Sequence, residues 1–465
     1  MVERCAEWVG EFGDLRLNRL AGLLCELISE KMSICLRKLA GNRNLEVAFG
    51  RLMKNEKFSL QKIVRFTGKK TAGIAQGVDH VLVIEDTTEF CFETEHHRNR
   101  KGLGYLTSGY QFGFFVHPAL VVDAKSGACL GLSNVQFWTR EQRGTTKDDA
   151  YKKLPIEQKE SLRWISVAEK SKEALHRTKM MTIIADRESD IYEAWDRIPD
   201  SRTHALIRAQ ADRRLIGGEM LFETISASKL AGQYSLFLPA ITGKRAARTA
   251  TIAVRFKEVE ILKPKGCNDK TAPKSLKLFA VEAREVVPTP KGEAPVHWYL
   301  LTTHAIKDFQ GAMEIIHWYS QRWLIEQLFR TTKKQGLNLE SSQIETGESL
   351  MKLAMLALIA ATQSLQLVNA RDADEIRPYT DVFEQEDLPL LNLLSIKNEG
   401  KTIKQKNPNS PYSLKWTAWI IGRLGGWKGY KSERPPGPIT MRNGLNEYYA
   451  IKKGWQLSQT NMCIP

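Results

Sequence analysis

The chain has 465 residues, a hydrophobic fraction of 42% and a formal net charge of +15. This length indicates two or three domains, and this composition excludes a disordered chain. The positive charge favours polyanionic partners, with nucleic acid ahead of an anionic membrane surface. No uninterrupted apolar segment reaches the length of a membrane span, and the first residues lack the apolar stretch of a signal peptide.

The seven cysteines are scattered along the chain without a CxxC pair. A zinc ribbon or a disulfide framework is therefore not expected, and reduced thiols in a cytoplasm fit best. The nine histidines form no HExxH motif. Any bound metal should be held by oxygen ligands, which favours magnesium or manganese over zinc.

Residues 1–72 are predicted to form a helical domain, because apolar residues such as Leu20 and Leu24 recur at helical spacing. This segment is also dense in basic residues, among them Arg16 and Arg19. A basic helical domain suits contacts with the phosphates of a duplex. A solvated helical surface is the alternative interpretation.

The pattern changes from helix to strand at His80. A lysine- and glutamate-rich stretch at about 148–177 is predicted to be helical, because its composition is typical of a solvated helix. Around it, short apolar runs bounded by charged or turn-forming residues indicate the strands of one sheet. These predicted strands are 80–86, 113–123, 128–138, 180–186 and 204–209.

Between about 212 and 297 the chain is a series of alternating strands separated by turns, which predicts an all-β insertion with its own small core. A strand at 296–302 leads out of it into a helix at 311–335. A long apolar helix follows at about 348–369. The tail beyond it contains an exposed linker at 401–413 and one further helical segment.

The helix at 311–335 carries an unusual polar stripe beside an apolar face. At about 100° per residue, five polar residues fall within a stripe roughly 80° wide. One carboxylate is thus flanked by residues that suit phosphate contacts, although ordinary ion pairs four residues apart are the alternative interpretation. The five residues are Tyr319, Arg322, Glu326, Arg330 and Lys333.

Two aspartates end apolar strands and are candidate partners of Glu326. Asp86 follows the run VLVIE, and Asp186 follows MMTIIA. Strands leaving a buried sheet can hold carboxylates side by side, and a helix packed on that sheet can supply a third. Three such carboxylates can hold two divalent ions and support displacement at phosphorus. A strand-end turn for Asp86 and a helix cap for Asp186 are the structural alternatives.

Three ordered blocks surround these acidic residues: IEDTT, ADRESDIYE and YSQRWLIEQLFRTTKKQG. They resemble the blocks of the DDE transposases of the bacterial insertion-sequence-four group. The likeness is nearly full length, and within that group it is greatest to the cut-and-paste transposases of kanamycin-resistance transposons. The third block matches the group's Y-x2-R-x3-E-x6-K signature through Tyr319, Arg322, Glu326 and Lys333.

The resemblance implies an α/β fold whose ribonuclease H-like, mixed-sheet catalytic core spans 73–369, with an all-β insertion at about 212–297. It implies that an N-terminal helical domain at 1–72 binds transposon ends and that a C-terminal helical region at 370–465 pairs two protomers. The expected partners are double-stranded DNA, as terminal inverted repeats and target, and a second copy of the chain in a synaptic complex, with no membrane. The expected location is the bacterial cytoplasm, at the nucleoid.

The resemblance also implies the reaction, which is cut-and-paste transposition of an insertion sequence. Asp86, Asp186 and Glu326 would be the catalytic residues and the ligands of two Mg²⁺ or Mn²⁺ ions in each active site. Water would cut the DNA to leave a 3′-hydroxyl, which attacks the opposite strand and forms a hairpin. After the hairpin is reopened, the 3′-hydroxyl would join target DNA.

Hairpin formation requires a base displaced from its stack. Trp298 aligns with the family tryptophan that stacks on this base, although a core aromatic on a strand is the alternative. Tyr319, Arg322 and Lys333 align with the family's phosphate contacts beside the same base.

Two further basic residues are candidate DNA contacts. Arg208 aligns with another contact of the family, and Arg330 is suggested by the stripe, where the family also has a basic residue. The chain departs from the family pattern at Gln210, where a basic residue is expected, and aligns poorly over about 370–412.

Two other functions remain open from the sequence. A transposition inhibitor or regulator would bind transposon ends without cutting, but retention of all three carboxylates argues against it. Another ribonuclease H-like nuclease, such as a junction resolvase or a hybrid nuclease, would not need Trp298 and Tyr319.

Overall fold

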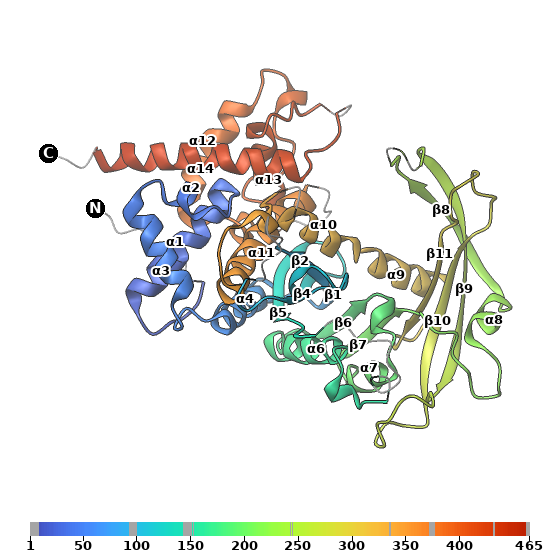
Figure 1. Ribbon diagram of the computed structural model, residues 1–465. Helices are drawn as coiled ribbons and strands as arrows, with labels where there is room; N and C mark the ends of the chain where they lie inside the picture. Colours follow the sequence, from blue (N-terminus) through green and yellow to red (C-terminus); the bar gives the residue numbers. More distant parts are fainter. Residues whose placement is uncertain are drawn as a thin grey trace.

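The structure is a computed structural model, and it describes residues 9–92, 100–142, 151, 153–241, 243, 245–333, 336–371, 377–430 and 433–461. A mixed sheet of eleven strands runs through the molecule. Helices of the N-terminal and C-terminal parts lie near one end of the sheet, and strands β8 to β11 continue it toward the other end (Figure 1).

The centre of the sheet is a group of five strands in the spatial order β5-β4-β1-β6-β7. β4 is antiparallel to both β5 and β1. β6 runs parallel to β1, and β7 runs parallel to β6. The short strands β2 (Thr88–Cys91) and β3 (Gly104–Tyr105) add to β4. The five are β1 (His80–Glu85), β4 (Phe112–Asp123), β5 (Cys129–Trp138), β6 (Met180–Ala185) and β7 (Thr203–Arg208).

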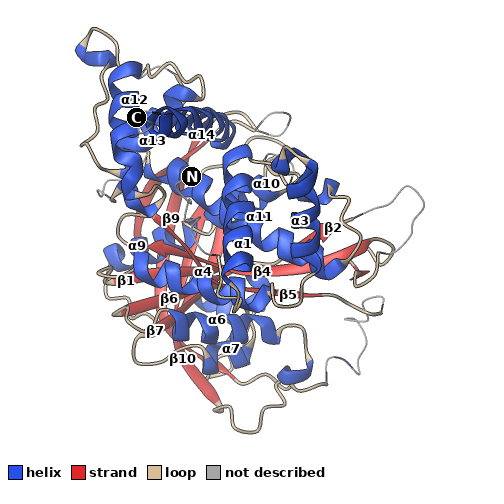
Figure 2. Ribbon diagram, turned by 90° about the vertical axis from the view of Figure 1, so that its left-hand side faces the viewer, coloured by secondary structure: helices blue, strands red, loops and turns tan. Residues whose placement is uncertain are grey.

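Side chains of β1 divide between two hydrophobic clusters because successive residues of a strand point to opposite faces. Leu82 and Ile84 belong to the cluster that contains α11 (Gly347–Ala370). Val81 and Val83 belong to the cluster built with α6 (Leu162–Ala174) and α7 (Tyr192–Arg197). The central strands are therefore buried on both faces, which explains their continuous apolar runs. Figure 2 shows these helices against the strands.

Parts of the predicted helix at 148–177 are helical in the described residues. Residues 143–150 and 152 lie outside the described residues, Tyr151 is helical, and a 3₁₀ turn at Ile156–Gln158 precedes α6. Burial of Trp164 and Ile165 fixes which face of α6 packs on the sheet.

The strands of the predicted insertion continue the same sheet. β11 (His297–Thr302) pairs with β7, and β10 (Ser275–Glu285), β9 (Arg248–Leu262) and β8 (Leu230–Leu238) follow in that order. The expectation of a separate small core is wrong, because Ile252 and Val254 belong to the α11 cluster while Val259 belongs to the other. The region is also not purely β, since it contains α8 (Leu221–Ser226).

The described part of the N-terminal region is helical, as the sequence predicts. Its apolar face packs on α11, where Leu24, Ile28 and Phe49 join the same cluster as Leu353. The helices are α1 (Leu15–Lys31), α2 (Leu36–Ala40), α3 (Arg43–Lys54) and α4 (Leu60–Ile74).

The predicted helix at 311–335 is two helices in the structure. α9 (Phe309–Ser320) and α10 (Trp323–Thr332) are separated by Gln321 and Arg322, whose backbones remain in the right-handed helical region. Residues 334–335 lie outside the described residues. The break places Arg322 at the start of α10, where its side chain can reach across to the sheet.

The expectation that no apolar segment reaches the length of a membrane span is wrong for α11. By length and composition this helix could cross a membrane, with a mean hydropathy of 1.5 over its most apolar window. In the structure 83% of that window is buried inside the protein. Such burial is that of a core helix, around which the N-terminal helices, β5 and α10 pack.

The C-terminal region is helical with 3₁₀ turns between its helices. Its own cluster joins Leu367 of α11 to Trp416, Ile420 and Tyr448. The predicted linker at 401–413 is mostly exposed and contains a single 3₁₀ turn at Ile403–Gln405. The helices are α12 (Leu388–Asn398), α13 (Leu414–Leu424) and α14 (Pro438–Asn461).

Candidate active site

Asp86 and Asp186 lie at the same edge of the sheet. β1 and β6 are adjacent and parallel, with Ile84 paired to Ile184. Each aspartate is two residues beyond its member of this pair, at the carboxyl end of its strand. This edge is where open α/β sheets place their functional side chains.

Asp86 is largely buried and held by two donors. The Arg322 guanidinium donates through Nη1 to Oδ2 at 2.8 Å, and the Thr87 backbone N–H donates to Oδ1 at 2.8 Å. The pKa of Asp86 is raised to about 6, chiefly by burial and then by the Asp186 carboxylate, with a smaller contribution from Glu326; Arg322 and the Thr87 N–H act in the opposite direction. The three acidic groups are therefore close enough to act on one another.

Glu326 lies in the first turn of α10 and meets Asp86 through Arg322. Arg322 Nη2 donates to Glu326 Oε1, four residues along the chain. One guanidinium thus bridges a carboxylate of the sheet and a carboxylate of the helix. The ordinary ion pair between Arg322 and Glu326 that the spacing allows is present, and it is also part of the shared site.

Asp186 caps the turn that follows its strand, as the structural interpretation of this residue predicts. Its Oδ1 accepts from the Glu188 backbone N–H at 2.9 Å and caps the 3₁₀ turn Arg187–Ser189. The electrostatic effect of Asp186 on Asp86 shows that capping does not remove it from the site. An aspartate at this position can cap the turn with one oxygen and face the site with the other.

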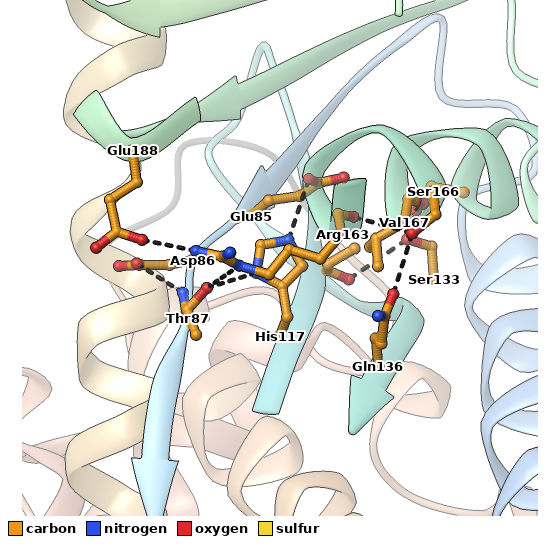
Figure 3. A network of polar contacts seen from close by, with 12 residues as sticks. Glu85, Asp86, Thr87, His117, Ser133, Gln136, Arg163, Ser166, Val167 and Glu188 are labelled. Carbon is orange, nitrogen blue, oxygen red and sulfur yellow. Dashed lines mark hydrogen bonds and ion pairs between the residues drawn. The ribbon is translucent and has the colours of Figure 1, made fainter. Parts of the chain in front are cut away.

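A buried polar network supports Asp86 from behind, and sequence reasoning missed it (Figure 3). Thr87 Oγ1 accepts from Arg163 Nε at 2.9 Å and lies 2.9 Å from His117 Nδ1. His117 Nε2 lies 3.3 Å from Glu85 Oε2. Because Thr87 also donates its N–H to Asp86, this network fixes the backbone beside the candidate catalytic carboxylate.

The inner pair of this network is uncharged. Burial raises the pKa of Glu85 well above its usual range, and burial together with the Arg163 charge lowers the pKa of His117 well below its usual range. With both groups neutral, a consistent assignment has Glu85 donating to His117 Nε2 and Nδ1–H donating to Thr87 Oγ1. A lone histidine in the apolar strand run GFFVHPALVVD was the available signal.

Two further acidic residues of the block ADRESDIYE, around Asp186, contact groups outside the site. Glu188 accepts from Arg163 Nη2 at 2.7 Å, so this block contacts the network behind Asp86. The Asp190 carboxylate is fully buried and accepts from Arg213 and from the backbone N–H groups of Gln210 and Ala211. Asp190 therefore anchors the segment after β7, a structural role.

The aromatic candidates form a pair beside the site. Trp298 on β11 and Tyr319 on α9 meet edge to face with ring centroids 5.3 Å apart. Burial raises the pKa of the Tyr319 hydroxyl, which also interacts with the charges of Arg322 and Arg208. Arg208 donates through Nη2 to the His297 carbonyl at 3.0 Å. These residues come from three elements and are brought together with Arg322.

The remaining basic candidates have other described surroundings. Arg330 lies over the half-exposed ring of Trp323, 5.0 Å from its centroid, and Lys333 lies over Phe90 at 5.3 Å. Arg16 and Arg19 are exposed on α1, which packs on α11 and α14. The structure thus groups Arg208, Tyr319 and Arg322 with the carboxylates.

The donor chemistry of the site fits a hard divalent cation, because it consists of carboxylate oxygens. The Asp186 and Glu326 carboxylates raise the pKa of Asp86, and a bound cation would relieve this repulsion. Within the described ranges, however, no three His, Cys, Asp or Glu side chains lie close enough together to form a metal site as they stand. The Arg322 guanidinium lies between two of the three carboxylates.

Residues 166–363 match the sequence model of the family described as the transposase DDE domain, a range that includes Asp186 and Glu326 and begins after Asp86. A cryo-EM structure of a piggyBac transposase synaptic complex with hairpin DNA aligns with 80% of this chain at 10% identity, with a TM-score of 0.33. The alignment spans 57% of the length of that protein. The family match therefore shows that residues 166–363 resemble a transposase DDE domain.

Proposed function

We propose that this chain is a metal-dependent DNA transposase that cuts and joins DNA at Asp86, Asp186 and Glu326. The observation that carries the proposal is the Arg322 guanidinium that joins Asp86 to Glu326, 240 residues away in the sequence, at the sheet edge that also holds Asp186. Two of these carboxylates come from the ends of adjacent parallel strands and the third comes from a helix. The transposase family match covers the second and third acidic residues.

The proposed catalytic core has a ribonuclease H-like fold. Its support is the strand order β5-β4-β1-β6-β7, with three antiparallel strands followed by two that run parallel to β1. In this arrangement β1 is central, and its carboxyl end carries Asp86. The proposed core spans 73–369, and the strands at about 212–297 are an insertion that enlarges the sheet.

Two divalent ions, Mg²⁺ or Mn²⁺, bound by the three carboxylates would activate the attacking oxygen and stabilise the leaving oxygen of the phosphodiester. The chain's own residues position them. Thr87 and the buried pair behind it hold the Asp86 carboxylate, while the first turn of α10 presents Glu326. Arg322 supplies a positive charge at the same place and can contact a phosphate.

The finer mechanism that we propose is cut-and-paste transposition through a hairpin intermediate. The chain would bind the terminal inverted repeats of an element of the insertion-sequence-four group and later join the freed 3′-hydroxyls to target DNA. The Trp298–Tyr319 pair supports this proposal, because a partly buried indole packed on Tyr319, which itself interacts with Arg322, offers a stacking surface for a displaced base. Arg208, Arg330 and Lys333 are proposed phosphate contacts.

The flanking helical regions have proposed roles in assembly. Residues 1–72 would bind transposon ends through basic residues such as Arg16 and Arg19, which are exposed on α1. Residues 370–465 would pair two protomers in a synaptic complex. The net charge of +15 suits close approach to several DNA segments. The proposed setting is the bacterial cytoplasm, at the nucleoid.

The test uses purified full-length protein and duplex DNA carrying the inverted repeats that flank its coding region. With Mg²⁺ or Mn²⁺, denaturing gels should show a nick followed by a hairpin. Glu326→Gln, Asp86→Asn and Asp186→Asn should each lower the cleavage rate by at least roughly 10²- to 10³-fold. Glu314→Gln, which changes an exposed glutamate on α9, should cut normally.

Binding of these ends without metal-dependent cleavage would identify the non-cutting regulator instead. A preference for branched DNA or RNA–DNA hybrids over linear ends would identify the other nuclease. Either result would contradict the proposal, whereas cleavage that requires all three carboxylates supports it.

A further inference from the structure

The Arg322 side chain occupies the space between two proposed metal ligands. Its Nη1 is 2.8 Å from Asp86 Oδ2, and its Nη2 bonds Glu326 Oε1. The two nitrogens belong to one planar guanidinium, so both carboxylates face the same delocalised positive charge. A divalent ion bound by both carboxylates needs oxygen atoms that Arg322 now uses.

We infer that Arg322 is an internal cation that closes the metal site, so that a divalent ion binds by displacing it. The inference rests on the proposed function, because it takes Asp86 and Glu326 as metal ligands. It extends that function by giving Arg322 a second role before DNA is bound. In this role Arg322 competes with the metal, whereas a phosphate contact acts only on the substrate.

The charges around Arg322 support this competition. The ionised carboxylates of Asp86 and Glu326 would repel each other without a nearby positive charge. Arg322 supplies that charge from within the chain, through its ion pairs with both carboxylates. The two carboxylates can therefore stay ionised and close together until a divalent ion replaces the guanidinium.

The position of Arg322 allows such a replacement without moving a helix. Arg322 lies in the short break between α9 and α10, and its side chain is 21% exposed. A long, partly exposed side chain can change rotamer while the backbone stays in place. Tyr319 and Arg208 line the same region, so the displaced guanidinium would remain beside the surface where a phosphate is expected.

Arg330 provides a matched control on the same helix. It carries the same charge as Arg322, but its guanidinium stacks on Trp323. Removing it changes the net charge of α10 equally without opening the site between Asp86 and Glu326. The comparison therefore separates displacement at the site from a general electrostatic effect on cation binding.

The experiment is calorimetric titration of MnCl₂ into the full-length chain without DNA, so that no catalysis or phosphate contact contributes. Arg322→Gln should bind Mn²⁺ roughly tenfold more tightly than the unchanged chain, the size expected for removing one charge-assisted competitor. Arg330→Gln should change the affinity by less than about twofold, since the competitor remains in place. Near-ultraviolet circular dichroism establishes that each variant is folded.

Arg322→Lys is the second variant, and it keeps the positive charge. A single ammonium cannot bridge two carboxylates as a planar guanidinium does, so its Mn²⁺ affinity should lie between those of the unchanged chain and Arg322→Gln. If Arg322→Gln does not fold, the Mn²⁺ affinity of Arg322→Lys is compared with that of the unchanged chain instead. Equal or weaker Mn²⁺ binding by both Arg322 variants would overturn the inference, as would an equal gain with Arg330→Gln.

Glu326→Gln distinguishes failure of this inference from failure of the proposed function. If Glu326→Gln abolishes Mn²⁺ binding while the Arg322 variants gain no affinity, the metal site exists and only the displacement is wrong. If the unchanged chain and both Arg322 variants bind no Mn²⁺ in a way that depends on Glu326, the metal site itself is wrong, and the proposed function fails with it.

Discussion

At the scale of single residues, the environment of Asp86 depends on groups that no motif contains. Thr87 joins two partners that come from distant parts of the chain, Arg163 on α6 and His117 on β4. Arg163 and His117 act on the backbone around Asp86, which His117 also reaches at Asp86 itself, so both are positioning residues. Their combined effect is to fix the backbone that carries the candidate metal ligand.

Thr87→Val should destabilise the protein by about 1–3 kcal/mol, because it leaves buried donors of Arg163 and His117 without their shared oxygen at nearly constant volume. Urea unfolding measures this change. The variant should also weaken Mn²⁺ binding, since Asp86 is no longer held in place. Thr87→Ser keeps the hydroxyl and should restore both properties; equal behaviour of the two variants would show that the hydroxyl is not needed.

At the scale of elements, β1, β6 and β7 carry different chemistry at their two ends. Their carboxyl ends hold the acidic site, and their amino ends hold a histidine cluster that lies close to Trp318. His80 and His304 each lie 2.7 Å from the hydroxyl of Thr182, and His204 stacks on His304 with ring centroids 3.8 Å apart. Two ends of the same strands thus have unrelated roles.

This histidine cluster should make the fold sensitive to acid. The pKa of His80 is lowered to about 4 and that of His304 to about 3, in both cases chiefly by burial and then by the charge of His204. Asp123 acts in the opposite direction at His80, and Asp200 does so at His204. Because the folded values lie below the unfolded value near 6.5, the unfolded chain binds protons first. Stability is therefore fully present above about pH 6.5 and is lost as the pH falls toward 4.

His304→Gln should make this loss shallower by up to about 1.4 kcal/mol per pH unit, because one depressed pKa is removed while a hydrogen-bonding group remains. Thermal unfolding measured from pH 7 down to about pH 4 tests it. His176→Gln changes an exposed histidine and should leave the profile unchanged. Identical profiles for the two variants would contradict the assignment of acid sensitivity to the cluster.

At the scale of the whole molecule, α11 joins the N-terminal helices to the catalytic core and the C-terminal helices (Figure 1). Its buried Lys352 donates to the carbonyls of Met53 and Asn55, at the C-terminal end of α3, and pairs with Glu348. A buried lysine is costly unless its donors are satisfied. This contact therefore specifies how the basic N-terminal region sits on the core.

Lys352→Met should destabilise the protein by about 1–3 kcal/mol and increase proteolysis near residues 54–60, because the carbonyls of Met53 and Asn55 lose the ammonium donor and only Met53 keeps a second one, from Ser349. Urea unfolding and limited proteolysis measure the two effects. Glu348→Gln removes only the largely exposed partner and should cost less than about 0.5 kcal/mol. Equal costs for the two variants would show that the ion pair, and not the buried contact, holds the helices together.

Much of the candidate site could be read from local patterns. Apolar runs ending in Asp86 and Asp186 predicted strand ends, and helical spacing placed Arg322 and Glu326 on one face. The structure has those strand ends, although it divides the helix at Arg322. Short-range periodicity carries such information because it reflects which face of an element is buried.

The sequence by itself determined the strands, the helices and the acidic residues that end or interrupt them, because side-chain periodicity and turn chemistry act over a few residues. Only the tertiary structure decided that the later strands share the central core, that α11 is a buried helix, and that Arg163 and His117 support Asp86. These outcomes depend on contacts between residues far apart in the chain, whose free energies exist only after the elements pack together.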